Sequence, residues 1–115
     1  MKDWITIQKR YLQDSVPIQL GGLASNLRRI TSFSMYEGNR EQVESLIQEC
    51  KFFIEWTAKD THIDAMADLA DLQREITSWQ RNWIKIWSGP ILRKETADIS
   101  RRWSDRVLEM TVFLD

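Results

Sequence analysis

The chain has 115 residues, of which 43% are hydrophobic and 29% are charged. This composition is typical of a soluble globular protein, and the length suits one domain spanning residues 1–115. Only two prolines and four glycines occur, and no alternating run of β-branched residues is long enough for a strand. The sequence therefore predicts an all-α fold. The longest uncharged stretch, residues 15–27, is too polar to cross a membrane.

The location and charge of the chain can be predicted from simple features. The first residues, MKDWITIQKRY, lack the apolar run of a secretory signal, and Cys50 is the only cysteine. Both features favour a cytoplasmic protein, and the apolar neighbours of Cys50 predict a packed side chain rather than a reactive thiol. The net charge is −1, but residues 37–75 carry ten acidic and four basic side chains, while both flanks are basic. Such polarity can steer partners or subunits towards one another.

The first half of the chain predicts three helices. The first, from about Lys2 to Asp14, places Trp4, Ile7, Tyr11 and Leu12 on one face. The second runs from Pro17 to about Tyr36, with proline in its first turn. Within it, Gly21-Gly22 costs roughly 1 kcal/mol per glycine against alanine, which predicts close approach by another backbone or a local irregularity. The third runs from about Arg40 to Lys59, and Phe52 and Trp56 give its end a second apolar edge.

The second half of the chain predicts two longer helices. The fourth begins at a cap formed by Asp60 or Thr61 and continues to Trp87, and the fifth runs from Pro90 almost to the C-terminus. The apolar positions of the fourth are Ile63, Met66, Ala67, Ala70, Ile76, Trp79, Trp83, Ile86 and Trp87. Those of the fifth are Leu92, Thr96, Ile99, Trp103, Val107, Met110 and Leu114.

Short connections between these helices predict antiparallel neighbours. The last four should form an up-down-up-down four-helix bundle, with a short additional N-terminal helix. The predicted fourth helix extends beyond the third by roughly one to two turns, and its end from Trp83 to Trp87 is apolar nearly all round. We expect residues 2–14 to cover that end, with a second subunit as the alternative.

The tryptophans are the strongest pattern in the chain. Trp79, Trp83 and Trp87 are spaced by four residues, so on one continuous helix they would share a face and form a buried seam. A core or interface role is favoured over a cofactor site. The alternative is a ligand pocket between the first helix and this seam, with Trp4, Tyr11, Trp83 and Trp87 as its candidate residues.

Two pairs of carboxylates offer a possible metal site. Glu41-x-x-Glu44 and Asp68-x-x-Asp71 form a pattern that resembles the magnesium-binding helices of all-α nucleotide pyrophosphohydrolases of the MazG type, apart from Asp as the first acid of the second pair. The resemblance implies magnesium-dependent hydrolysis of nucleoside triphosphates. A hairpin folded near residue 60, however, leaves Glu44 about 7 Å along the axis from the second pair. The register thus predicts no metal site at these residues.

The remaining polar residues indicate no catalytic or nucleic-acid site. His62 is the only histidine and stands at a helix start, where we expect it to be exposed in a capping turn. On the last helix, Asp98 precedes Arg102 by four residues and Arg101 precedes Asp105 by four, so these arginines have acidic partners. This pairing does not favour nucleic-acid binding.

The sequence favours a noncatalytic interaction or accessory protein. We expect a protein partner or self-association, no membrane partner, and neither a catalytic residue nor a cofactor. Two alternatives remain open. One is a bundle that binds a small molecule in a tryptophan-lined apolar pocket, and the other is a MazG-like pyrophosphohydrolase.

Overall fold

A computed structural model describes residues 2–112, and these residues contain six α-helices, one 3-10 turn and no strand. The prediction of an all-α bundle with a short N-terminal helix is confirmed. The elements in chain order are α1 (Trp4–Leu12), α2 (Val16–Phe33), η1 (Glu37–Asn39), α3 (Arg40–Ala58), α4 (Ile63–Arg81), α5 (Trp83–Ser88) and α6 (Pro90–Val112).

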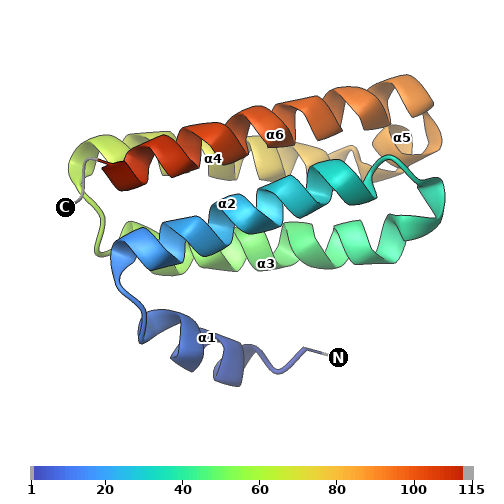
Figure 1. Cartoon of the computed structure of the whole chain (residues 1–115). Coiled ribbons are helices and arrows are strands. Elements are labelled where there is room, and N and C mark those ends of the chain that lie inside the picture. Colours follow the sequence, from blue (N-terminus) through green and yellow to red (C-terminus); the bar gives the residue numbers. More distant parts are fainter. Residues whose placement is uncertain (1, 113–115) are drawn as a thin grey trace.

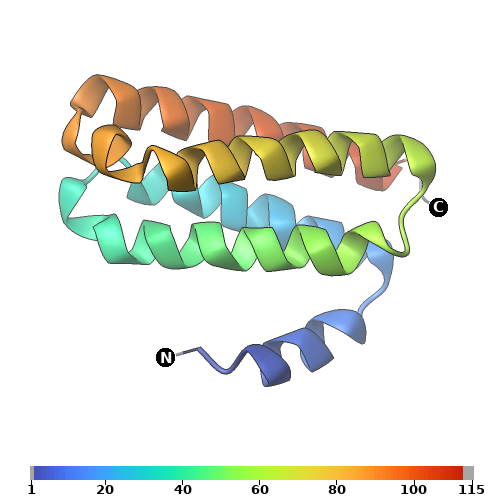
Figure 2. The same ribbon diagram turned by 180° about the vertical axis from the view of Figure 1, so that it is seen from behind.

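The helices α2, α3, α4 and α6 run side by side in alternating directions, as Figures 1 and 2 show from opposite sides. The principal extents are 40 × 29 × 21 Å. The α1–α2 turn, the α3–α4 turn and the end of α6 gather at one end of the long axis. The α2–α3 connection and α5 lie at the opposite end.

The centre of the bundle is built from aliphatic side chains on α2, α3 and α4. Because these residues repeat at three and four positions, they form one continuous stripe on each helix. Side chains that are almost fully buried include Leu20, Leu23, Leu27, Ile30, Val43, Cys50, Leu69, Leu72 and Ile76. The predicted second helix and the packed position of Cys50 are confirmed.

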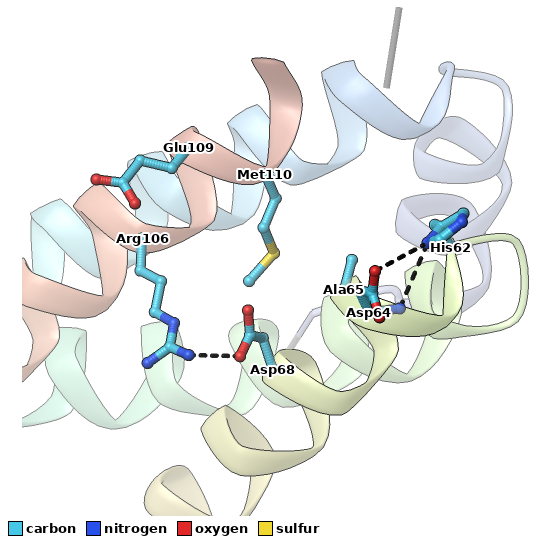
Figure 3. A pocket seen from close by; sticks show the side chains of 7 residues that line it. All are labelled: His62, Asp64, Ala65, Asp68, Arg106, Glu109 and Met110. Atoms are coloured by element: carbon cyan, nitrogen blue, oxygen red, sulfur yellow. Dashed lines mark hydrogen bonds and ion pairs between the residues drawn. The ribbon is translucent and has the colours of Figure 1, made fainter. Parts of the chain in front are cut away.

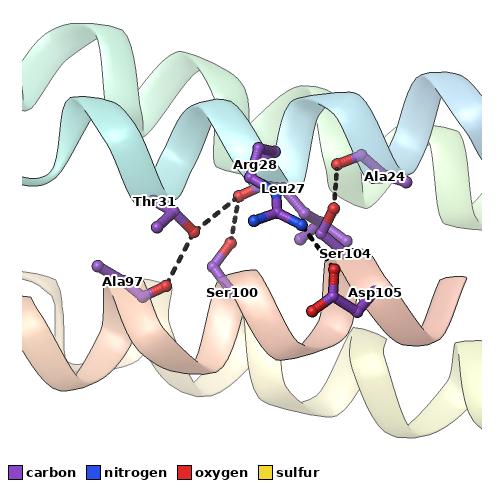
Figure 4. A network of polar contacts seen from close by, with 8 residues as sticks. All are labelled: Ala24, Leu27, Arg28, Thr31, Ala97, Ser100, Ser104 and Asp105. Carbon is purple, nitrogen blue, oxygen red and sulfur yellow. Dashed lines mark hydrogen bonds and ion pairs between the residues drawn. The ribbon is translucent and has the colours of Figure 1, made fainter. Parts of the chain in front are cut away.

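Small residues join α2 to α6 along a closely packed seam (Figure 4). Ala24 on α2 and Ala97, Ser100 and Ser104 on α6 are all buried, and such short side chains allow two helix backbones to approach closely. Three hydroxyls donate across the seam: Thr31 to the Ala97 carbonyl at 2.8 Å, Ser100 to Leu27 at 2.7 Å and Ser104 to Ala24 at 2.8 Å. These bonds satisfy buried polar groups that would otherwise be costly.

The glycine pair of α2 lies beside this seam, where Gly21 lines a surface groove with Ser104 of α6. A Cβ atom added at Gly21 or Gly22 would meet nothing within 4 Å, and neither glycine has a positive φ. The prediction that Gly21-Gly22 marks close approach by another backbone is therefore wrong for this fold. Alanine and serine provide the close contact instead, through Ala24 on α2 and the small residues of α6.

Replacing Gly21 or Gly22 by Ala is expected to raise the free energy of unfolding by about 0.5–1 kcal/mol each, because alanine restricts the unfolded chain and meets no obstacle in the helix. Urea denaturation of the two variants measures the gain. Ala24→Gly on the same helix is the matched control and should lower stability, since Ala24 is buried. A loss of stability in Gly21→Ala and Gly22→Ala would contradict the open surroundings of the pair.

The predicted fourth helix is interrupted near its C-terminal end. Its regular part ends at Arg81, and Asn82 adopts φ −106° and ψ 20° before α5 begins at Trp83. Both the backbone N–H and the side-chain amide of Asn82 donate to the Ser78 carbonyl, at 3.1 and 3.0 Å. The helix breaks at this single residue and resumes at Trp83, so the prediction of one continuous helix to Trp87 is wrong. The interruption allows α5 to pack against α6.

The start of α4 also differs from the prediction. His62 is the N-cap, and its Nδ1 accepts a hydrogen bond from the Asp64 N–H at 3.4 Å. Neither of the predicted residues caps α4. Thr61 is buried and donates to the Thr57 carbonyl at 2.6 Å, and Asp60 lies in the preceding turn. The expectation of an exposed capping-turn histidine is confirmed.

The first half of α4 turns the face with the larger apolar side chains toward the core. Its buried residues are Ala65, Leu69, Leu72, Ile76 and Trp79. The residues predicted to face the core at this point, Ile63, Met66, Ala67 and Ala70, are exposed. The leucines remove more apolar area from water than the alanines would, which explains the choice. On α6, Ile99 and Trp103 are half-buried, Val107 and Met110 are buried, and Leu114 lies outside the described residues.

The N-terminal helix packs against α3 and not against α5. Trp4 meets Phe52 with ring centroids 4.5 Å apart, Tyr11 stacks on Phe53 at 4.1 Å, and the Lys2 ammonium lies 2.7 Å from the Glu49 carboxylate. The prediction that residues 2–14 cover the Trp83–Trp87 end is therefore wrong. The second apolar edge of α3 is the surface that α1 covers, and Trp56 on that edge is buried as expected.

Candidate functional site

The four predicted ligand-binding residues fall into two separate clusters. Trp4 and Tyr11 contact the C-terminal half of α3. Trp83 and Trp87 lie together, with ring centroids 5.1 Å apart. The Trp83 indole N–H donates to the Glu44 carboxylate near the start of α3, and the Trp87 indole N–H donates to the Glu37 carbonyl in η1. The structure does not bring the two pairs into one pocket, and ligand binding at any of these residues stays a prediction.

The tryptophan seam is only partly buried. Trp79 and Trp87 are 3% and 7% exposed, which confirms their predicted burial, whereas Trp83 is half-buried. Trp83 lines a groove of about 470 Å³ together with Glu41, Glu44, Ser45, Ile47, Gln48 and Gln80. Carboxylates and amides dominate this lining, so the groove differs from the apolar pocket that the sequence suggested.

The two carboxylate pairs face different partners. Glu44 pairs with Arg40 at 2.9 Å and accepts a bond from the Trp83 indole, while Asp68 pairs with Arg106 at 2.6 Å. Asp71 pairs with Arg74. Within residues 2–112, no group of three or more His, Cys, Asp or Glu side chains is placed to hold a metal ion.

A pocket of about 380 Å³ lies between the first turns of α4 and the last turns of α6 (Figure 3). Its lining comprises His62, Asp64, Ala65, Asp68, Arg106, Glu109 and Met110. Ala65 and Met110 are buried and form its apolar part, whereas Asp64 and Glu109 are exposed at its rim. The Arg106–Asp68 ion pair closes one side.

The lining of this pocket would accommodate an apolar side chain that is followed or preceded by a positively charged one. The lining carries three carboxylates against one guanidinium, and its imidazole is engaged as the cap of α4. The sequence did not indicate this pocket, because the two groups of residues that line it are some 40 residues apart in the chain. The sequence feature that could have indicated it is the group of acidic residues at the start of α4.

The two strongly shifted titratable groups lie in the packed core. Burial raises the pKa of the Tyr11 hydroxyl and of the Cys50 thiol above their usual ranges. Tyr11 donates to the Gln19 carbonyl at 3.0 Å and stacks on Phe53, and Cys50 is fully buried. Neither group lines the two pockets described above, so these shifts reflect packing and not a site prepared for catalysis.

Cys50 is expected to resist thiol reagents while the protein is folded. Burial excludes the reagent and raises the pKa of the thiol, which depletes the reactive thiolate. Absorbance measurement with a disulfide reagent should show no rapid reaction in buffer and one thiol per chain in denaturant. Rapid stoichiometric labelling of the folded protein would contradict the buried position.

The opposite end of the bundle exposes large apolar side chains. Ile84, Ile91, Tyr36 and Met35 are 76%, 73%, 67% and 60% exposed. Their backbones are held by two contacts between the turns at this end: the Arg93 guanidinium donates to the Ser34 carbonyl at 3.2 Å and to the Trp87 carbonyl at 2.9 Å. The apolar side chains therefore project from a fixed scaffold.

No protein-family model, curated protein or solved structure matches the chain. The resemblance to MazG-type enzymes consequently rests on four carboxylates, which the fold places in two separate environments. In the part of the chain that the structure describes, no helix is both long enough and apolar enough to span a membrane. The pocket, the exposed apolar end and the charge distribution are the features that bear on function.

Proposed function

We propose that this protein is a noncatalytic interaction module of the cytoplasm that binds a protein partner through the ends of its helical bundle. The observation that carries the proposal is the group of four side chains, Ile84, Ile91, Tyr36 and Met35, that are at least 60% exposed at one end. Leaving such side chains in water gains nothing for folding, and clusters of them typically mark interaction sites.

The buried polar groups also favour a binding role. The seam between α2 and α6 uses its serines and threonine to bond backbone carbonyls, which leaves these hydroxyls no freedom to act as nucleophiles. The single histidine caps a helix. Magnesium-dependent hydrolysis of nucleoside triphosphates is the weaker alternative, and an assay with and without magnesium addresses it directly.

Binding of a small molecule is a second candidate function, favoured by the groove beside Trp83. Its volume of about 470 Å³ would admit a compound of moderate size, and the half-buried indole offers a stacking surface. Quenching of tryptophan fluorescence by a compound library, lost in Trp83→Leu, would support this role.

The interaction proposal is tested by site-specific photocrosslinking in the native host. A photoreactive phenylalanine analogue is placed at Ile84, and the control carries it at Arg101, which is exposed at the centre of α6. We expect a discrete crosslinked protein from position 84 and none from position 101. Equal, diffuse labelling from both positions would contradict the proposal.

A further inference from the structure

We infer that the partner is a second copy of this chain, bound head to tail: the apolar end around Ile84 enters the acidic pocket beside His62 of the next copy. This inference rests on the proposed interaction function and adds the identity of the partner. The apolar end consists of the exposed apolar residues Met35, Tyr36, Ile84 and Ile91 and the adjacent Lys85. The acidic pocket is the site shown in Figure 3.

The two surfaces have opposite charge. Residues 81–95, which include α5 and the start of α6, carry four basic side chains and one acidic side chain. The adjoining residues 33–41 add one basic and two acidic side chains, so the apolar end stays net positive. Residues 60–71 carry four acidic side chains and no lysine or arginine, and residues 104–112 add two acids and one arginine. Opposite potentials favour contact between these ends and disfavour contact between like ends.

The two surfaces also match in the placement of apolar and charged side chains. Ile84 is the most exposed large hydrophobic residue of the described chain and lies on the short helix α5, beside exposed Lys85. The pocket has an apolar interior of Ala65 and Met110 and a rim of exposed Asp64 and Glu109. Ile84 would occupy the interior, which removes apolar area from water on both sides, and Lys85 would approach the rim carboxylates.

The position of the ends determines the type of assembly. The apolar end and the acidic pocket lie at opposite ends of the long axis of the bundle (Figures 1 and 2). One contact between two copies therefore leaves one apolar end and one acidic pocket unoccupied. Such a heterologous contact continues into a ring or an open chain of subunits. The bundle is 29 × 21 Å in cross-section, which limits the contact to about 600 Å² per copy, below the usual size of a stable interface. Assembly should therefore be reversible and depend on concentration and salt.

Sedimentation velocity of the purified full-length chain tests the inference. We expect the weight-average sedimentation coefficient to rise over about a hundredfold increase in concentration and to fall back at high salt. Ile84→Glu alters the apolar end, and Asp64→Lys with Glu109→Lys alters the acidic pocket. All three positions are exposed, so the fold should persist, and each variant should remain monomeric. Ile5→Glu on the outer face of α1, where Ile5 is 71% exposed, is the matched control and should assemble like the natural chain.

A mixture of the two variants gives the sharpest readout. The Ile84→Glu variant retains an intact pocket, and the Asp64→Lys/Glu109→Lys variant retains an intact apolar end. An equimolar mixture should form a heterodimer held by a single contact, and no larger species, because its two remaining ends are the altered ones. A natural chain that is monomeric at every concentration, or variants that fail to complement each other, would overturn the inference.

The same measurements separate this inference from the function on which it rests. If the chain is monomeric but position 84 crosslinks to a different protein in the host, self-association is wrong and the interaction function stands. If the chain is monomeric and position 84 labels no more specifically than position 101, both are wrong.

Discussion

Replacing Trp79 by Ala is expected to lower the free energy of unfolding by about 3–5 kcal/mol, because its indole is 3% exposed in the core face of α4 and its loss leaves a large cavity. Trp83→Ala should cost clearly less, about 1–2 kcal/mol, since Trp83 is half-buried and follows the interruption at Asn82. One continuous helix would have placed both indoles in the same environment.

Urea denaturation followed by circular dichroism measures both variants. The conservative replacement Trp79→Phe serves as a control and should recover part of the loss, because it refills much of the cavity. Equal losses for Trp79→Ala and Trp83→Ala, with the fold retained, would contradict the different burial of the two residues and would favour an unbroken α4.

The bundle could be predicted from the sequence because its signals are local and strong. Leu20, Leu23, Leu27 and Ile30 repeat at helical spacing, and Pro17 and Pro90 stand in the first turns of α2 and α6. Short connections then leave antiparallel packing as the simplest arrangement. These features do not depend on any contact between distant residues, so they can be recognised without a structure.

The interruption of α4 could not be predicted by the same reasoning. The residues around Asn82 keep the helical spacing of apolar side chains, since Trp79, Trp83 and Trp87 continue to repeat every four residues. The decisive contacts are a local side-chain bond from Asn82 to Ser78 and distant bonds that hold Trp87 against Glu37. Asparagine is a modest helix former and not a reliable stop signal.

The candidate sites were the least predictable part. The acidic pocket needs residues from the start of α4 and the end of α6, which meet only in the folded chain. The choice of inward face on α4 likewise depends on what α3 and α6 offer for packing, so Met66 and Ala70, which the spacing predicts as core, are exposed. Composition and charge correctly indicated where acids and bases concentrate, but not which of them share a pocket.

The location of α1 leads to the second large expected effect. This helix has nine residues, too few to be stable alone in water, so it depends on its contacts with α3. Tyr11 provides the main anchor: its ring stacks on Phe53 and lies 5.6 Å from the Trp56 ring, and its hydroxyl donates to the Gln19 carbonyl. In return, the Gln19 side chain donates to the Tyr11 carbonyl at 3.2 Å.

Tyr11→Ala is therefore expected to lower the free energy of unfolding by about 3–5 kcal/mol and to release α1 from α3. Tyr11→Phe keeps the ring and removes the hydroxyl, so it should cost about 1 kcal/mol. Ile5→Ala on the exposed face of α1 should change stability by less than about 0.5 kcal/mol. Amide hydrogen exchange provides the matching local readout, because release of α1 should remove protection from residues 5–12 while α2 and α6 stay protected. If Tyr11→Ala melts like the natural chain and α1 remains protected, the contacts with α3 do not hold this helix, and its cover must lie elsewhere on the bundle.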